Sequence, residues 1–139
     1  MKFFEVKVRY KRVVDNQHKT VTEVYAIAAQ TFSDAEHKAI EAITPYAEGE
    51  VEVIAEKIAL YNNYVYSDTP RVDDKYYLVK YAIVGVNEDT GKVTREYRHV
   101  LIEAIDVESV PDVFSREISS LTSRELTSVK ETNILEVFQ

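Results

Sequence analysis

The chain opens with Lys2-Phe3-Phe4-Glu5-Val6-Lys7-Val8-Arg9-Tyr10, in which apolar and charged side chains alternate. A period of two residues is typical of a β-strand that buries one face. The pattern places Val6, Val8 and Tyr10 on one side of this strand. The charged side chains on the other side are Glu5, Lys7, Arg9 and Lys11. A weaker copy follows later as Lys75-Tyr76-Tyr77-Leu78-Val79-Lys80-Tyr81, which indicates one structural unit that is written twice.

The first half of the chain is predicted to have the order β-β-α-β. Two strands over residues 3–14 and 20–30 flank a polar turn at 15–19 and form a hairpin. Thr31 and Ser33 each stand three residues before a carboxylate, which is the signature of a helix start. Pro45 ends this helix, because the residue before a proline disfavours helical geometry. The alternating segment 50–60 then predicts a third strand.

The second half repeats this order. Strands at 76–86 and 93–104 surround a turn at 87–92, a helix begins within 109–112, and one extended segment covers 125–138. The apolar side of the second helix is predicted to be core, namely Val110, Phe114, Ile118 and Leu121. The predicted fold is therefore α+β: two tandem β-β-α-β repeats with an antiparallel sheet, two packed helices and a pseudo-twofold. A chance similarity of two α+β halves is the alternative.

The expected organisation is a single domain, 1–139, built of two repeats. The first repeat covers 1–61 and the second 75–139, with a joint at 62–74 where turn-forming residues interrupt the pattern. A unit of half this length buries little apolar surface on its own, so the two copies are expected to share a core.

The composition excludes several classes of protein. The chain has no cysteine, so disulfides and thiolate metal sites are absent. No apolar run resembles a signal peptide or a membrane span, and we expect a cytoplasmic protein without a membrane partner. The net charge of −7 is spread evenly over both halves, so the overall charge does not attract nucleic acid.

No motif for catalysis is present. The glycines Gly49, Gly85 and Gly91 stand too far apart to form a phosphate-binding loop. The three histidines lack the spacing of metal ligands, and no serine lies in a nucleophile elbow. Glu50 and Glu52 could form an acid/base or cation pair, with a solvated strand face as the alternative. We expect no enzyme, no cofactor and no metal.

The sharpest feature is the basic side of the opening strand. Cations that follow phosphates, next to aromatic rings on which bases stack, are typical of single-stranded nucleic-acid binding. The second half supplies further cations and an aromatic residue on its strands. The predicted binding residues are Lys7, Arg9, Lys11, Tyr77, Lys80, Arg95 and Arg98. The alternative is an exposed sheet face, on which lysines discourage aggregation between strand edges.

The whole chain resembles a family of uncharacterised domains from gut bacteria and their phages. The residues that carry the resemblance are the start 1–10, the block 31–36, Pro45-Tyr46 and the closing segment 131–138. The resemblance implies a small cytoplasmic protein of unknown activity, often encoded in mobile or phage DNA. It carries no functional residue over to this chain.

We therefore expect a non-enzymatic binding protein of phage or mobile-element type that engages single-stranded nucleic acid. The alternative is a protein–protein interaction module, an adaptor or an inhibitor of a host system. Such a module could form a homodimer through an exposed strand or through the tyrosine-rich joint.

Overall fold

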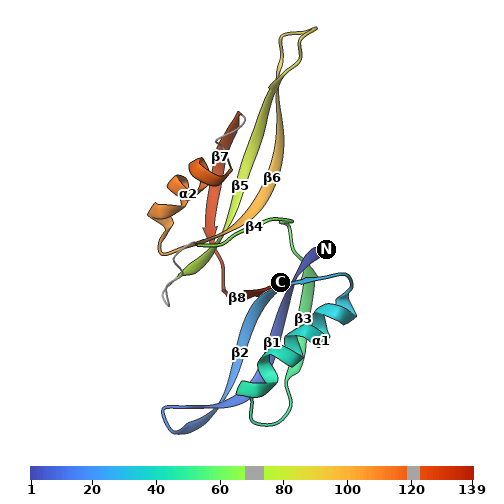
Figure 1. The fold of residues 1–139 in the computed structure, drawn as a ribbon, viewed down its shortest axis with the longest axis vertical. Coiled ribbons are helices and arrows are strands. Elements are labelled where there is room, and N and C mark those ends of the chain that lie inside the picture. The colour runs from blue at the N-terminus through green and yellow to red at the C-terminus, as the bar shows by residue number, and fades with distance from the viewer. Residues whose placement is uncertain (68–73, 119–122) are drawn as a thin grey trace. The chain divides into compact units, whose positions relative to one another are not determined.

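A computed structural model of the chain describes residues 1–67, 74–118 and 123–139. The chain is α+β and divides into two compact units, each with a sheet and a helix (Figure 1). The first unit consists of Met1–Ala59 together with Asn133–Gln139, and the second unit is Leu60–Thr132.

The sheet of the first unit has four strands in the order β3-β1-β2-β8. β1 (Lys2–Val14) pairs antiparallel with β2 (Gln17–Ala29) on one side and with β3 (Glu52–Ile58) on the other. β8 (Ile134–Phe138) runs parallel to β2 and forms the opposite edge of the sheet. The last strand of the chain thus belongs to the sheet that the first strand begins.

The β1–β2 hairpin closes with two residues. Asp15 and Asn16 have φ angles of 52° and 61°, the left-handed values that a tight type I′ hairpin turn needs at both central positions. The sequence predicts a longer turn over 15–19. The predicted turn is too long, because β2 already begins at Gln17 and the polar residues Gln17 to Lys19 are an exposed part of that strand.

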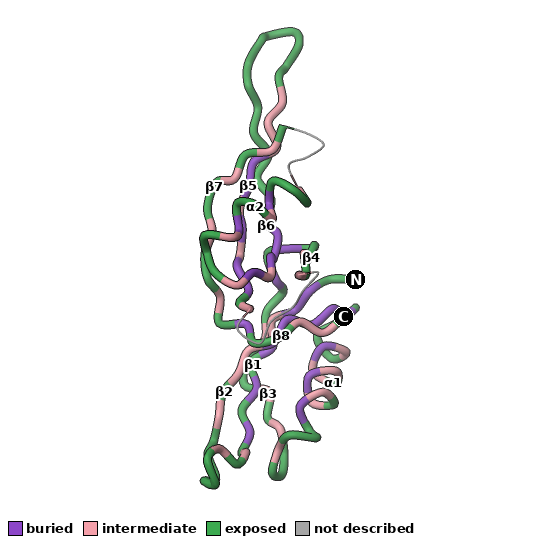
Figure 2. The backbone as a smooth tube through the Cα atoms, turned by 60° about the vertical axis from the view of Figure 1, so that its left-hand side comes forward, coloured by how far each residue is buried: buried purple, intermediate pink, exposed green. Residues whose placement is uncertain are grey.

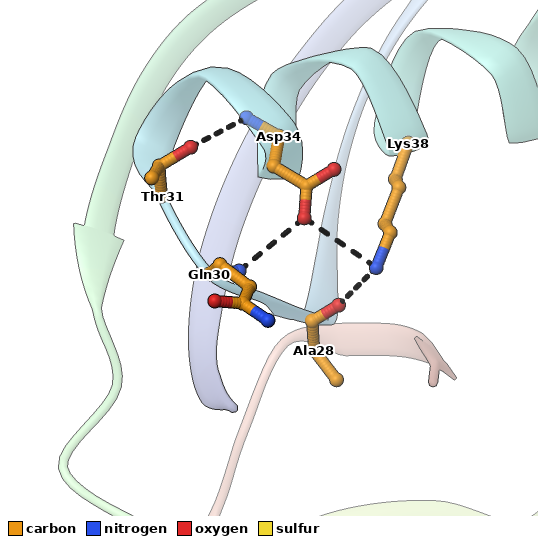
Figure 3. A network of polar contacts seen from close by, with 5 residues as sticks. All are labelled: Ala28, Gln30, Thr31, Asp34 and Lys38. Carbon is orange, nitrogen blue, oxygen red and sulfur yellow. Dashed lines mark hydrogen bonds and ion pairs between the residues drawn. The ribbon is translucent and has the colours of Figure 1, made fainter.

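Helix α1 (Phe32–Ile43) begins at Thr31, as the sequence predicts (Figure 3). The Asp34 backbone N–H donates to Thr31 Oγ1 at 3.1 Å, which satisfies one free donor of the first turn. The Asp34 carboxylate accepts from the Gln30 backbone N–H and lies 3.6 Å from Lys38 Nζ. Lys38 also donates to the Ala28 carbonyl, so these contacts attach the first turn of the helix to the end of β2.

The core of the first unit lies between α1 and one side of the sheet. A short 3₁₀ turn (Thr44–Tyr46) follows α1. The buried side chains of α1 are two alanines and an isoleucine, so the strands provide the larger core residues. The buried residues of this core are Phe4, Val6, Val8, Tyr10, Tyr25, Ile27, Ala29, Ala35, Ala39 and Ile43.

The second unit has strands in the order β4-β6-β5-β7. β5 (Lys75–Val86) and β6 (Val93–Ala104) form a long antiparallel hairpin, and β7 (Arg124–Glu131) pairs antiparallel with β5. β4 (Tyr64–Val65) adds two residues parallel to β6. Of the predicted joint at 62–74, residues 68–73 lie outside the described part of the chain.

Helix α2 (Val110–Glu117) packs on this sheet through Val110 and Phe114, as predicted. Ile118 is half-buried against the same core, and Leu121 lies outside the described residues. The helix is preceded by a 3₁₀ turn (Val107–Ser109) whose cap is Asp106. Ser109 is the N-cap residue of α2, without a side-chain cap hydrogen bond, and its backbone N–H donates to Asp106 Oδ1 at 2.9 Å.

The closing segment differs from the sequence-based prediction of one extended stretch over 125–138. β7 ends at Glu131, and the Thr132 backbone N–H donates to the Tyr76 carbonyl at 3.0 Å. After Asn133 the chain joins β2 of the first unit as β8. The second unit therefore ends at Thr132, whereas the sequence places all of 75–139 in the second repeat.

Candidate functional site

The basic side of β1 is exposed, as the alternation predicts. Val6 and Val8 are fully buried towards α1, whereas Lys7, Arg9 and Lys11 lie on the opposite side of the sheet. Arg9 Nη2 forms an ion pair with Glu52 Oε2 at 2.8 Å. Part of the positive charge of this surface is therefore neutralised within the first unit.

Lys7 also lines a shallow hollow of about 230 Å³ on this side of the first sheet. Glu5 and Lys57, which lie 3.9 Å apart, line it as well. The aromatic residue that β1 places on this side is Phe3, and it is buried. Among the described residues of β1 to β3, this surface offers cations without an exposed phenylalanine or tyrosine ring on which a base could stack.

The second unit brings cations and an exposed ring together on the side of its sheet away from α2. The register sets His99 opposite Lys80, Tyr97 opposite Ala82 and Arg95 opposite Val84. Lys130 of β7 lies on the same side, opposite Leu78. We call this surface the Tyr97 patch, and it consists of Lys80, Arg95, Tyr97, His99 and Lys130.

The geometry of the Tyr97 patch centres on one ring. Tyr97 is 53% exposed, and Lys80 Nζ lies 4.8 Å from its ring centroid, a cation–π arrangement. Arg95 Nε is 3.6 Å from Glu125 Oε2, which is the carboxylate that the register places on this side of β7. Lys80, Arg95 and Lys130 thus outnumber the acid here, although the chain as a whole is acidic.

Two of the residues predicted to bind do not reach this surface. Tyr77 is 2% exposed and packs in the core under α2, where burial raises the pKa of its phenol. Arg98 projects to the side of the sheet on which α2 lies, and its Nη2 is 3.0 Å from Glu96 Oε1. Both differences follow from strand alternation, since neighbours along a strand point to opposite sides.

Tyr97 is the residue that sequence reasoning missed. A signal was available, because Tyr97 stands two positions after Arg95 on the same predicted strand and therefore on the same side. The alternation identifies it once Arg95 is taken as part of the surface.

A polar cluster in the first unit is structural in character. The hydroxyls of Tyr10 and Tyr25 both donate to Glu23 Oε1, and Arg12 Nη1 lies 3.7 Å from Glu23 Oε2. Burial, followed by the contact with Glu23, raises the pKa of both phenols. The two hydroxyls therefore stay protonated as donors at neutral pH and serve to hold the carboxylate.

Two acids, Glu36 of α1 and Glu56 of β3, lie near each other in the first unit. Glu56 Oε2 is buried and has no hydrogen-bond partner in the described part of the chain. Burial, and then Glu36, raises the pKa of Glu56. Both effects favour the protonated form of Glu56, because burial and a neighbouring negative charge penalise the carboxylate.

A hollow of about 500 Å³ in the second unit lies beside β4 and α2. Its acid Glu103 accepts from the Ser67 backbone N–H at 2.9 Å and from the Tyr64 hydroxyl at 3.3 Å. Burial raises the pKa of that Tyr64 hydroxyl. Within the described ranges, no group of three or more His, Asp and Glu side chains could hold a metal ion, and no helix is long and apolar enough to cross a membrane.

The chain was compared with protein families, curated proteins and solved structures. The model of one family, a domain of unknown function (DUF4494), matches residues 2–139. No curated protein and no solved structure gives a significant match.

Proposed function

The chain belongs to the DUF4494 family of domains of unknown function, and we propose that it binds single-stranded nucleic acid without catalysing a reaction. In this proposal the Tyr97 patch is the contact surface. The setting we propose is phage or mobile-element biology, in line with the resemblance of its sequence.

The observation that carries the proposal is the exposed Tyr97 ring with cations around it. Sheet surfaces that bind single strands combine an aromatic platform for the bases with positive charge along the phosphates. Lys80 lies over the ring at 4.8 Å, and Arg95 lies on the same side of β6. A base stacked on Tyr97 would bring its phosphates within reach of these cations.

The basic side of β1 has a lesser role in the proposal. Lys7, Arg9 and Lys11 are exposed and could follow phosphates, but their surface lacks an exposed phenylalanine or tyrosine ring among the described residues of β1 to β3. We therefore expect them to add affinity that depends on salt, without adding contacts to bases.

We also propose that the two units descend from one duplicated β-β-α-β unit, and shared positions support this. A break in strand register falls between Lys7 and Val8 in β1 and between Lys80 and Tyr81 in β5, positions that differ by 73. The hydrogen bond from Ala59 N to Phe3 O has its counterpart, shifted by 73 at both ends, from Thr132 N to Tyr76 O. The pseudo-twofold stays a prediction.

The nucleic-acid proposal is tested by titrating the protein into a fluorescently labelled oligothymidylate and measuring anisotropy. Because one stacked base contributes about 1–3 kcal/mol, Tyr97→Ala should raise Kd by about 5- to 150-fold. Replacing Lys80 and Arg95 by Gln should flatten the dependence of log Kd on log salt, since each lost phosphate contact removes about 0.7 from the slope for a single strand.

Matched controls come from the same chain. Tyr46→Ala removes an exposed tyrosine of the first unit, and Arg116→Gln removes an exposed cation from α2. Both should bind like the unmodified protein. An absence of salt-sensitive binding at micromolar protein, or a Tyr97→Ala variant that binds as tightly as the Tyr46→Ala control, would overturn the proposal.

A further inference from the structure

One edge of the second sheet is open along most of β6. β5 pairs with the whole length of β6 on one side, whereas on the other side β4 reaches only Leu101 and Ile102. In the described part of the chain, no strand pairs with the outer side of residues 93–100. Unpaired N–H and C=O groups along such an edge are a template for another strand.

The hydrogen bonds at both ends of β6 show which backbone groups point outward. The Lys92 carbonyl accepts from Asn87 N within the hairpin, and Leu101 N donates outward to the Asn63 carbonyl. Because backbone groups alternate along a strand, those of Val93, Arg95, Tyr97 and His99 point away from β5. Their N–H and C=O groups are available to a partner.

The first unit shows the corresponding edge in a covered state. There β8 pairs with β2 over Val24 to Ile27. Under the proposed duplication, positions in the two units differ by 73, so Val24 to Ile27 correspond to residues 97–100 of β6. No described strand pairs with the outer side of these residues. The second sheet therefore presents an open edge where the first sheet carries an additional strand.

The open edge belongs to a hairpin that extends beyond the rest of its sheet (Figure 1). β7 pairs with β5 as far as Ile83, and the Val84 backbone N–H donates to the Ser123 carbonyl. Among the described residues, the hairpin has two strands from Gly85 and Thr94 to its tip. Figure 2 shows this end as exposed, and it includes Val86 and Val93. A two-stranded ribbon is marginally stable in water by itself, and it gains support when a further strand joins.

We propose that a second copy of this chain occupies this edge, with the two β6 strands antiparallel and Tyr97 opposite the partner's Tyr97. The pairing covers residues 94–100, because β4 occupies the outer side of Leu101 and Ile102. In this register Glu96 of each copy faces Arg98 of the other, giving two pairs of opposite charge. Within one chain, Glu96 and Arg98 already form an ion pair at 3.0 Å. In the dimer each of these side chains would pair with the same residue type of the other copy. Opposite charges directly across two strands stabilise a sheet.

The neighbouring registers that keep outward-pointing groups paired are less favourable. Moving the twofold centre by one residue sets Glu96 against Glu96 or Arg98 against Arg98, and moving it to Arg95 sets two arginines together. Like charges directly opposite each other are destabilising. The charge sequence of β6 therefore selects the register centred on Tyr97.

The contact leaves the Tyr97 patch accessible, because strand pairing uses backbone groups while the side chains still project from the sheet. The two patches would then lie on one continuous sheet. The self-association stands without the proposed function, since Glu96 and Arg98 lie on the side of the sheet away from the Tyr97 patch.

The test is a charge reversal followed by sedimentation-velocity ultracentrifugation over a micromolar concentration series. The unmodified protein should form a dimer. Glu96→Arg and Arg98→Glu each place like charges across the twofold, so each variant alone should dimerise at least about tenfold more weakly. The double variant, E96R with R98E, restores opposite pairs and should dimerise like the unmodified chain.

A mixture of the two single variants gives the sharpest outcome. All cross-strand charges are then complementary, so E96R and R98E chains should form a heterodimer although neither self-associates well. A monomeric unmodified protein, or single variants that dimerise normally, would overturn the inference, and so would a mixture that stays monomeric. Circular dichroism of each variant checks folding, and oligothymidylate binding by the E96R chain reports on the proposed function separately.

Discussion

The ring of Phe138 packs against the ring of Tyr25, with their centroids 5.5 Å apart. Phe138 is the next-to-last residue of the chain, and Tyr25 lies in the second strand. The contact accompanies the parallel pairing of β8 with β2 and closes the core of the first unit. The stability of the first unit therefore depends on a segment that follows the second unit in the sequence.

Phe138→Leu should lower the free energy of unfolding by about 0.5–1.5 kcal/mol, because an aromatic pair contributes this much beyond the apolar area that it buries. Urea denaturation followed by circular dichroism measures the change. Leu135→Ala in the same strand is the matched control, since Leu135 is exposed and its truncation should change stability by less than about 0.5 kcal/mol. Equal losses in the two variants would contradict the assigned packing of β8.

Glu56→Gln should stabilise the protein at neutral pH. The pKa of Glu56 is raised above 4.5 by burial and by Glu36, so the folded chain binds a proton more readily than the unfolded chain. The stabilising contribution of the protonated carboxyl is complete below about pH 4.5 and is lost as pH rises through the raised pKa. The amide keeps the hydrogen-bonding capacity without the charge.

Thermal denaturation at several pH values checks this prediction. The advantage of Glu56→Gln should be largest at neutral pH and should shrink below about pH 4.5. Glu50→Gln removes an exposed acid just before β3 and serves as the control. A Glu56→Gln variant that is less stable than the control at neutral pH would show that the charged Glu56 carboxylate does not destabilise the fold.

Tyr25→Phe should make the protein more resistant to alkaline unfolding. The pKa of Tyr25 is raised by burial and by Glu23, so the folded state favours the neutral phenol. The neutral phenol's contribution to the free energy of unfolding is fully present below the ordinary phenol pKa of 10. It is lost as the pH rises above that value towards the raised pKa. At neutral pH the same change should cost about 0.5–1.5 kcal/mol, the net worth of one hydrogen bond.

Stability as a function of pH above neutrality measures both effects, and Tyr46→Phe is the exposed control. Curves for Tyr25→Phe and the unmodified chain that stay parallel up to strongly alkaline pH would refute the role given to the Tyr25 phenol.

Phe114→Ala should cost about 3–5 kcal/mol, the usual loss for a buried phenylalanine. Phe114 is 3% exposed under the second sheet, and its ring lies 5.5 Å from that of Tyr81. Chemical denaturation gives the value, with Val107→Ala in the exposed 3₁₀ turn as the control. A loss below about 1 kcal/mol would show that Phe114 is not a core residue.

Much of the local structure could be predicted from the residues. Val8 and Arg9 separate into a buried and an exposed side because alternation is a property of the strand itself. Thr31 starts α1 because its hydroxyl accepts from a backbone N–H three residues later. Such features depend on neighbours in the sequence, so they can be identified without the rest of the fold.

The candidate surface was predictable in part. Their charge predicts Lys80 and Arg95 as binding residues, and both lie on one side of the second sheet. Tyr77 was chosen for its ring, but which tyrosines of β5 face α2 depends on where the helix packs. Alternation along the strand places Tyr97 on the side of Arg95, but only the register of β5 and β6 sets it beside Lys80.

By itself the sequence determined the hairpins, the helix starts and the buried sides of the strands, because these follow from short-range periodicity and capping. Only the tertiary structure decided where Ile134–Phe138 goes. Its apolar residues would suit an edge of either sheet, and no local rule chooses between them. The choice follows from packing over a long sequence separation, where β2 offers a free edge and Tyr25 offers a ring for Phe138.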